Sequence, residues 1–222
     1  MAVIINYGAG NLRSVQKACE FIGTDAKISS DAADILSADR VILPGVGAFG
    51  DCMAALNASG LADPIRTIID KGVPFLGICL GLQLLFEQSE ERPNAQGLGI
   101  FKGKCVRIPS KEGYKIPHIG WNSIGFSKES PLFDGIDGGA YVYFVHSYYM
   151  QPEDKSIITA VCDYSARMPV ALQKGNAFAV QFHPEKSGDT GLKILKNFIG
   201  IKESRHKRRK HKKFGGRFGG RI

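Results

Sequence analysis

The alternation of short apolar runs with helical patterns in the first half of the chain most constrains the fold. Residues 3–6, 40–43 and 73–77 are short and strongly apolar, as buried strands are. Residues 12–21 place apolar side chains at helical spacing, and a second helix is expected at 80–86, directly after the third strand. Strands that alternate with helices in this way are typical of parallel β-α-β units, so we expect an α/β fold.

The pattern changes between residues 101 and 181, where β-rich runs follow one another with turns between them. The runs are 104–108, 141–145, 157–161, 170–173 and 177–182. We expect antiparallel or mixed strands at one side of the same sheet, followed by a last helix at about 190–199. The expected fold class is an open, mixed, mostly parallel sheet flanked by helices. No repeat or linker interrupts residues 1–201, which we expect to form one domain.

Length and composition fit one ordinary domain followed by a tail. The chain has 222 residues and is 44% hydrophobic, which is enough for a sizeable core. No apolar run approaches the roughly 20 residues that a membrane-spanning helix needs. The N-terminus also lacks the basic start of a signal peptide. These features predict no membrane association and a cytoplasmic location.

The excess positive charge belongs to the C-terminal end of the chain. The formal net charge is +8, but ten Lys and Arg and one Glu stand at 202–222, which leaves 19 basic and 20 acidic residues in 1–201. This end has no apolar periodicity and contains two FGGR units, so we expect 202–222 to be a disordered basic tail. Such a tail could bind RNA or another polyanion. We favour a disordered extension without a role in catalysis.

Cys79 lies where the third apolar run meets the following helix, between two glycines in the segment GICLG. This G-x-C-x-G pattern is the cysteine counterpart of the nucleophile elbow. A helix N-terminus favours the thiolate, which is the attacking species. Gln83 lies one helical turn further on the same face and could hold a polar substrate beside the sulfur. The alternative is a small buried core cysteine, as most free cysteines are. The five scattered cysteines contain no CxxC pair and suggest neither a metal site nor disulfides.

A nucleophilic cysteine needs a base, and His183 stands at the end of an apolar run, directly before Pro184 and Glu185. Proline fixes its own backbone, so the carboxylate two residues after the histidine can turn back toward the imidazole. There the carboxylate would select the tautomer and stabilise the imidazolium, as the acid of a triad does. The alternative is a surface loop in which His-Pro-Glu has no chemical meaning.

A glycine-rich segment, Gly45-Val46-Gly47, follows the second strand. In an acyl-transfer site its backbone N–H groups could stabilise the oxyanion together with the N–H of Leu80, which follows the nucleophile. The alternative is a phosphate-binding loop, but the segment lacks the context of a dinucleotide fingerprint. The three segments together therefore favour acyl-transfer chemistry.

These segments resemble the class I (triad) glutamine amidotransferases, in which GICLGLQ corresponds to the nucleophile elbow and QFHPEKS to the base-and-acid motif. The resemblance is closer still to the glutaminase subunits of imidazole glycerol phosphate synthases, through YGAGNLRSV, LPGVGAFG, PHIGWN and YFVHSYY. It covers residues 1 to about 200. The basic tail is not part of the family pattern.

The resemblance implies glutamine hydrolysis with Cys79 as nucleophile, His183 as general acid and base, and Glu185 as its orienter. It implies no metal and no organic cofactor. Charge complementarity independently suits the Glu91 carboxylate to the α-ammonium group of the substrate. The remaining glutamine-binding groups implied by the family are Gln83 and backbone groups at Gly47, Ser147 and Tyr148.

The resemblance also implies a partner. Ammonia would pass, within a heterodimer, to a (β/α)8-barrel cyclase subunit that converts PRFAR to imidazole glycerol phosphate and AICAR in histidine biosynthesis. A closed passage would keep the ammonia concentrated at its acceptor. The interface residues expected from these motifs are Asn11, Arg13, Trp121, Asn122, Tyr143 and Lys186. For Trp121 and Tyr143, core packing is the alternative.

Three other functions stay open on the sequence. A paralogous glutaminase could supply ammonia to a different synthase, for example in surface-sugar amidation, because the acceptor chemistry belongs to the partner. A catalytically silent domain could bind polyanions through its tail. A cysteine peptidase of the same broad fold is the third, although Gln83 and Glu91 suit a small amino-acid substrate.

Overall fold

The computed structural model describes residues 1–202. The predicted tail therefore lies outside the described residues, except for Lys202, which is exposed. Among the described residues, no helix is both long and apolar enough to span a bilayer.

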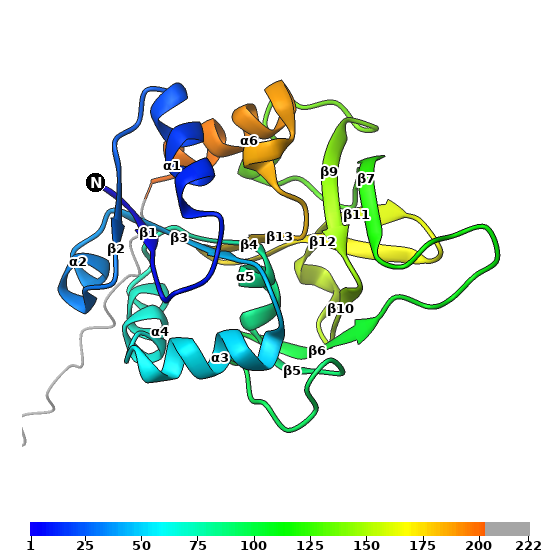
Figure 1. Ribbon diagram of the computed structural model, residues 1–222. Coiled ribbons are helices and arrows are strands. Elements are labelled where there is room, and N and C mark those ends of the chain that lie inside the picture. Colours follow the sequence, from blue (N-terminus) through cyan, green and yellow to red (C-terminus); the bar gives the residue numbers. More distant parts are fainter. Residues whose placement is uncertain (203–222) are drawn as a thin grey trace, which may run out of the picture.

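The core of the molecule is an eight-stranded mixed sheet, as the sequence predicted (Figure 1). Its strands, in spatial order, are β2 (Ala26–Ser29), β1 (Ala2–Ile5), β3 (Arg40–Gly45), β4 (Phe75–Cys79), β13 (Ala177–Val180), β12 (Arg167–Lys174), β11 (Ile158–Asp163) and β8 (Gly125–Phe126). The first five are parallel to one another, and the last three join through antiparallel pairs.

Helices cover both faces of this sheet, α1 and α6 on one face and α3 and α4 on the other (Figure 1). Side chains alternate along β1: Val3 and Ile5 pack into one core cluster, while Ala2 and Ile4 pack into the other. Both faces of β1 are buried, which explains its continuous apolar run. The helices are α1 (Leu12–Phe21), α2 (Ala32–Leu36), α3 (Phe49–Ala58), α4 (Ala62–Asp70), α5 (Leu80–Leu84) and α6 (Gly188–Gly200).

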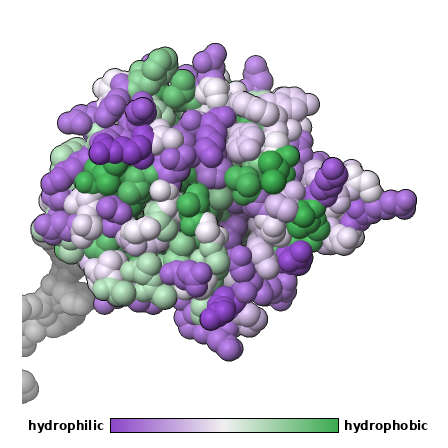
Figure 2. Space-filling model, viewed as in Figure 1, coloured by the Kyte–Doolittle hydropathy of each residue, from purple (hydrophilic) through white to green (hydrophobic). Residues whose placement is uncertain are grey.

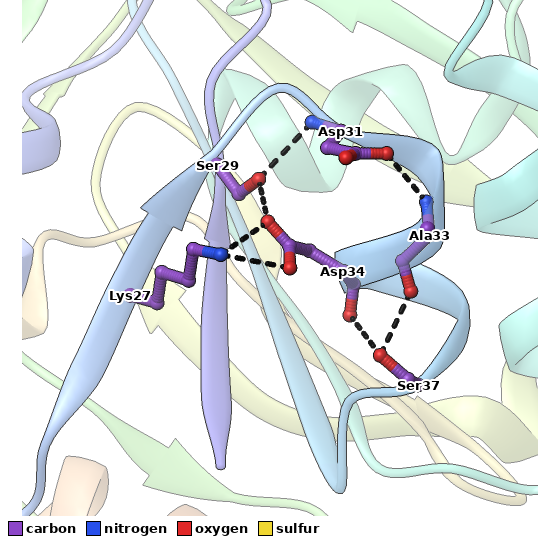
Figure 3. Close-up of polar contacts among 6 residues, drawn as sticks. All are labelled: Lys27, Ser29, Asp31, Ala33, Asp34 and Ser37. Atoms are coloured by element: carbon purple, nitrogen blue, oxygen red, sulfur yellow. Dashed lines mark hydrogen bonds and ion pairs between the residues drawn. The ribbon is translucent and has the colours of Figure 1, made fainter.

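The short helix α2 is tied to the edge strand β2 by polar contacts (Figure 3). Asp31 caps the helix, since its carboxylate accepts a hydrogen bond of 2.8 Å from the N–H of Ala33. The Asp34 carboxylate accepts from Ser29 and pairs with Lys27 on the strand. A charged lysine on an edge strand also discourages pairing with another chain.

Two small sheets lie beside the large one, and here the sequence prediction of a single sheet was wrong. One joins β10 (Tyr148–Pro152), β6 (Phe101–Arg107) and β5 (Phe86–Ser89), and the other joins β7 (His118–Ser123) to β9 (Tyr141–His146). Single-turn helices lie at Pro131–Phe133, Lys155–Ile157 and Pro184–Lys186. The Gly-Trp-Asn segment of the PHIGWN motif is part of strand β7.

Two predicted boundaries also differ from the structure. Strand β3 continues through Pro44 to Gly45, because these two residues still pair with β4 although the pairing with β1 ends at Ile42. Helix α5 ends at Leu84 rather than at residue 86. A returning segment pairs with the chain at that point, since the N–H of Phe101 donates to the carbonyl of Leu85. No element was predicted from the sequence at β2, β5, β7, β8, β10, α2, α3 or α4.

Candidate active site

Cys79 is the last residue of β4 and immediately precedes α5. Its φ of 55° lies in the left-handed region, which is costly for a residue with a side chain and is typical of a nucleophile elbow. The flanking glycines make this turn possible. A Cβ on Gly81 would lie 1.9 Å from the carbonyl oxygen of Leu43, and one on Gly77 would lie 2.9 Å from the carbonyl oxygen of Gly81. Glycine at position 81 therefore allows α5 to lie against β3, and glycine at position 77 allows α5 to fold back against β4.

The side chains of His183 and Glu185 contact each other after the end of β13. The distance from His183 Nδ1 to Glu185 Oε1 is 2.8 Å, and the two side chains are 2% and 1% exposed. Pro184 begins the single turn that returns the carboxylate to the imidazole. Within the described residues, His183 Nε2 is buried and makes no hydrogen bond. The free nitrogen is thus the one that a reacting group could use.

The charge state of His183 follows from its neighbours. Burial by itself lowers the pKa of His183, but Cys79 and Glu185 beside it raise the pKa more, to about 10. The backbone is also held in place. His183 donates its N–H to the Tyr143 carbonyl at 2.9 Å, and Ser187 Oγ donates to the His183 carbonyl at 2.6 Å. Cationic imidazole beside a sulfur suits acid–base work on a thiol.

A cavity of about 270 Å³ contains Cys79 and His183 together. It brings seven other predicted residues to the same place: Val46, Gly47, Leu80, Gln83, Glu91, Ser147 and Tyr148. Gly45 is not among the lining residues; a Cβ there would lie 2.7 Å from the N–H nitrogen of Gly81, so Gly45 allows close packing behind the elbow. A larger open groove of about 1170 Å³ lies between residues 126–135 and the end of α6, and its lining includes neither cysteine nor histidine.

The predicted substrate-binding side chains already have protein partners. Glu91 accepts a hydrogen bond of 2.7 Å from the N–H of Phe49 through Oε2, at the start of α3. Gln83 donates from Nε2 to Gln181 Oε1 at 3.0 Å. In the predicted oxyanion segment, Gly47 has a φ of +105°, and the Val46 carbonyl accepts from Cys52 Sγ at 3.4 Å.

Sequence reasoning missed three buried polar residues near the cavity: Gln181, His118 and His146. Gln181 Nε2 donates to Cys79 Sγ at 3.6 Å. His146 lines the cavity, and its Nε2 lies 3.0 Å from His118 Nδ1. Gln181 was visible as the first letter of QFHPEKS. Nothing in the sequence pairs the two histidines, which are 28 residues apart.

Three of the predicted interface residues lie together at the β7–β9 pair. Trp121 is opposite Tyr143 in the strand register, with ring centroids 6.2 Å apart, and Lys186 Nζ lies 5.9 Å from the centroid of the Tyr143 ring. Trp121 is 55% exposed, so core packing was the wrong alternative for it. Asn122, also on β7, donates to the Asp163 carbonyl at 3.1 Å.

The side-chain hydrogen bonds of the two predicted interface residues at the start of α1 are local, among the described residues. Asn11 Oδ1 accepts from Ser14 Oγ at 2.9 Å, and Arg13 contacts Gln16. Figure 2 shows one face of the molecule, on which apolar side chains form separate patches among polar ones. The large apolar side chains exposed on β7 and β9 are Ile119, Trp121 and Tyr141.

Comparison with known structures shows the fold. The chain superposes on the structure of PurLQS from Thermotoga maritima with a TM-score of 0.71 and 21% identity, covering 89% of this chain and 96% of that one. A crystal structure of a glutamine amidotransferase gives a TM-score of 0.69 with 19% identity, covering 89% of this chain and 98% of the other.

Comparison of sequences is more specific. The chain is 55% identical over 198 residues to the imidazole glycerol phosphate synthase subunit HisH of Caldanaerobacter subterraneus subsp. tengcongensis, covering 89% of this chain and 97% of the relative. It is 52% identical over 203 residues to the subunit of the same name from Syntrophotalea carbinolica, covering 89% and 98%. The family model for class I glutamine amidotransferases matches residues 3–201. The chain therefore belongs to the class I glutamine amidotransferase family.

Proposed function

We propose that this protein is the glutaminase subunit of an imidazole glycerol phosphate synthase. The observation that carries the proposal is the 55% identity to a HisH subunit over 198 residues. The cavity that contains Cys79 and His183 supports it, because a sulfur nucleophile and an imidazole are the two groups that amide hydrolysis through a thioester requires. Residues 1–201 would form the catalytic domain, and the tail from residue 202 would take no part in the chemistry.

The first half of the reaction releases ammonia. Cys79 would react as a thiolate whose proton is held by the His183 imidazolium, and the sulfur adds to the side-chain carboxamide carbon of glutamine. The oxyanion that forms would be stabilised by the N–H of Leu80 and by the backbone of residues 45–47. His183 then gives its proton to the leaving nitrogen, the C–N bond breaks, and ammonia departs from a γ-glutamyl thioester.

The second half regenerates the enzyme. His183, left neutral by the first half, accepts a proton from water as the water attacks the thioester carbon, and the sulfur then leaves as a thiolate beside the imidazolium while glutamate departs. Glu185 accepts the Nδ1 hydrogen bond at 2.8 Å, so the other nitrogen is the one available for these transfers. The same contact stabilises the imidazolium in each half of the reaction.

Glutamine would be held by the other groups that line the cavity. We assign Glu91 to the α-ammonium group, since a carboxylate is the natural partner of a cation. One oxygen of Glu91 already accepts from the N–H of Phe49, which fixes the orientation of the carboxylate. Gln83 and backbone groups at Gly47, Ser147 and Tyr148 would bind the remaining polar atoms of the substrate.

The released ammonia would be used by a barrel-type cyclase subunit bound to the β7–β9 pair. Trp121, Tyr143 and Lys186 form the centre of the proposed interface, with Asn11, Arg13 and Asn122 around them. Strand β9 connects this surface to the active site, because the Tyr143 carbonyl accepts the N–H of His183. A partner that presses on Tyr143 can therefore influence the catalytic histidine, as coupling between two sites requires.

The test measures glutamate production by the full chain with its cognate cyclase subunit, with and without PRFAR. Cys79→Ala is expected to lower the rate by roughly 10⁴-fold or more, as loss of a nucleophile does. Cys162→Ala is the matched control, since that thiol is also buried but does not line the cavity. Equal rates for wild type and Cys79→Ala would refute the proposal.

A further inference from the structure

Two buried glutamine side chains form a chain of hydrogen bonds that ends on the Cys79 sulfur. Gln83 Nε2 donates to Gln181 Oε1 at 3.0 Å, and Gln181 Nε2 donates to Cys79 Sγ at 3.6 Å. Gln181 is 0% exposed and Gln83 is 5% exposed. A buried primary amide loses its bonds to water, so these partners decide how each amide is oriented.

The hydrogen bond from Gln83 determines which end of the Gln181 amide faces the sulfur. Its oxygen accepts from Gln83, so its NH₂ group is turned toward the sulfur. If Gln181 alone were turned over, two NH₂ groups would face each other and the amide oxygen would face the sulfur. The contact with Gln83 thus keeps a donor, rather than an acceptor, beside Cys79.

The backbone places this donor rigidly. Strands β13 and β4 are parallel neighbours, and Val180 pairs with Ile78 in their register. Cys79 is the last residue of β4, and Gln181 directly follows the end of β13. The N–H of Gln181 donates to the Val170 carbonyl at 2.8 Å, which anchors it to β12 as well. The same neighbouring strands therefore fix the backbone positions of Gln181 and Cys79 relative to each other.

The sulfur has a second neighbour, which favours the neutral thiol over the thiolate. Cys79 Sγ lies 3.9 Å from the Val145 carbonyl oxygen, which accepts the proton of the neutral thiol. A carbonyl oxygen stabilises the thiol but repels the thiolate, whereas an NH₂ donor bonds more strongly to the thiolate. Deprotonation of Cys79 therefore strengthens the contact with Gln181 and weakens the contact with Val145.

We propose that Gln181 is a positioning residue of the glutaminase reaction: its amide, oriented by Gln83, holds the Cys79 sulfur and stabilises its thiolate. The inference rests on the proposed function and adds a role for a residue of the QFHPEKS motif other than the catalytic pair. It also gives Gln83 a second task. With its NH₂ group engaged by Gln181, Gln83 keeps its amide oxygen for donors on the substrate.

The experiment follows the reaction of Cys79 with iodoacetamide as a function of pH. The full chain is labelled from about pH 6 to about pH 10, and the Cys79 peptide is quantified by mass spectrometry. Gln181→Met is the main variant, because Met is similar in length but donates no hydrogen bond. Gln88→Met is the control, since Gln88 is exposed on β5.

In Gln181→Met we expect the midpoint of labelling to rise by about one pH unit, the size expected for a lost hydrogen bond to a charged group. Gln88→Met should leave the midpoint unchanged. Gln83→Met, which keeps the Gln181 amide but removes its orienting partner, should give a smaller rise in the midpoint and a higher KM for glutamine. This second variant keeps the test decisive if Gln181→Met does not fold.

A role in packing alone predicts the same midpoint in wild type, Gln181→Met and Gln83→Met, and that result would overturn the inference. Glutamate production by the wild type with its cyclase subunit separates the two proposals. If the wild type is active and the midpoints coincide, only the role of Gln181 fails. If the wild type produces no glutamate with the cyclase and PRFAR present, the proposed function and the inference fail together.

Discussion

In two pairs of buried side chains an imidazole contacts a polar partner, and the pKa of the imidazole is shifted in opposite directions in the two pairs. In one, His183 Nδ1 lies 2.8 Å from a Glu185 carboxylate oxygen, and in the other His118 Nδ1 lies 3.0 Å from His146 Nε2. All three histidines are buried, at 2% to 6% exposed. The distances and the exposed fractions are nearly the same in the two pairs, so the neighbouring groups must account for the difference in pKa.

The pKa values move in opposite directions. Burial lowers the pKa of His118 to about 4 and that of His146 to about 3, whereas Cys79 and Glu185 overcome the effect of burial and raise the pKa of His183 to about 10. At neutral pH the first two are uncharged and the third is a cation. Of these three imidazoles, only the one beside Cys79 and Glu185 therefore carries a proton at neutral pH.

The neutral pair has a consistent set of hydrogen bonds. His146 Nδ1 donates to the Tyr148 carbonyl at 2.9 Å, which leaves Nε2 to accept from His118 Nδ1. His118 Nε2 then accepts from Asn122 Nδ2 at 3.4 Å. The rings of Phe144 and Tyr164 stack on His118. The pair therefore connects strand β7 to the cavity through uncharged groups, and it serves structure rather than proton transfer.

The largest expected effect comes from removing the carboxylate that distinguishes the two pairs. Glu185→Gln should lower the pKa of His183 and reduce kcat for glutamine by about 10³- to 10⁴-fold, because the imidazolium and its tautomer lose their support. Steady-state glutamate production measures this change. Asp163→Asn, at an exposed carboxylate, is the matched control and should retain wild-type activity. If kcat is unchanged in Glu185→Gln, the carboxylate does not distinguish His183 from the neutral pair.

The pH dependence of stability is the next largest effect. The pKa values of His118 and His146 lie below 6.5 in the folded protein, so the unfolded state binds more protons in acid. Their contribution to the free energy of unfolding is complete above about pH 6.5. It falls as the pH drops toward about 4, by about 1.4 kcal/mol per pH unit for each group that titrates.

His183 acts in the opposite sense. Its pKa is raised, so its contribution is complete below pH 6.5 and is lost as the pH rises toward about 10. Urea unfolding at a series of pH values should therefore show losses on both the acid and the alkaline side. In Glu185→Gln the alkaline loss should become shallower while the acid loss stays. If the free energy of unfolding of the wild type does not fall in acid, the assignment of His118 and His146 as a neutral pair is wrong.

A smaller effect is expected from breaking the neutral pair itself. His118→Phe keeps a ring between Phe144 and Tyr164 but leaves His146 Nε2 without a donor, which costs about 1–3 kcal/mol for an unsatisfied buried group. The free energy of unfolding from urea titration at neutral pH measures this cost. The free energy of unfolding should also fall less steeply in acid, because one titrating group is gone.

The smallest effect is expected at the exposed end of the neutral pair. Asn122→Ala removes the part-buried hydrogen bond to His118, the exposed one to the Asp163 carbonyl and the acceptor of the Ser123 N–H. Water can replace these contacts, so we expect a loss of stability of about 0.5–1 kcal/mol and little change in the acid slope. A loss as large as that of His118→Phe would show that Asn122 orders the whole pair.

Much of the fold was predictable because the signals are local. Helix α1 has the predicted bounds, and the predicted strand–helix turn at Cys79 is present. The predicted helix at 190–199 lies within α6. Apolar spacing, the two glycines around Cys79 and the two-residue separation of His183 and Glu185 are all properties of short segments. A short segment determines its own conformation well when its neighbours in sequence are also its neighbours in space.

Only the tertiary structure decided the rest. The Gly-Trp-Asn segment is a strand because β9 lies beside it, and α5 is one turn long because the segment at residues 97–101 pairs with the chain at its end. Gln83 and Gln181 are 98 residues apart, and His118 and His146 are 28 apart. Contacts of this kind depend on strand order and register, which no local pattern encodes. The sequence alone therefore determined the fold class and the candidate chemistry, and strand pairing decided which buried polar side chains meet around the sulfur.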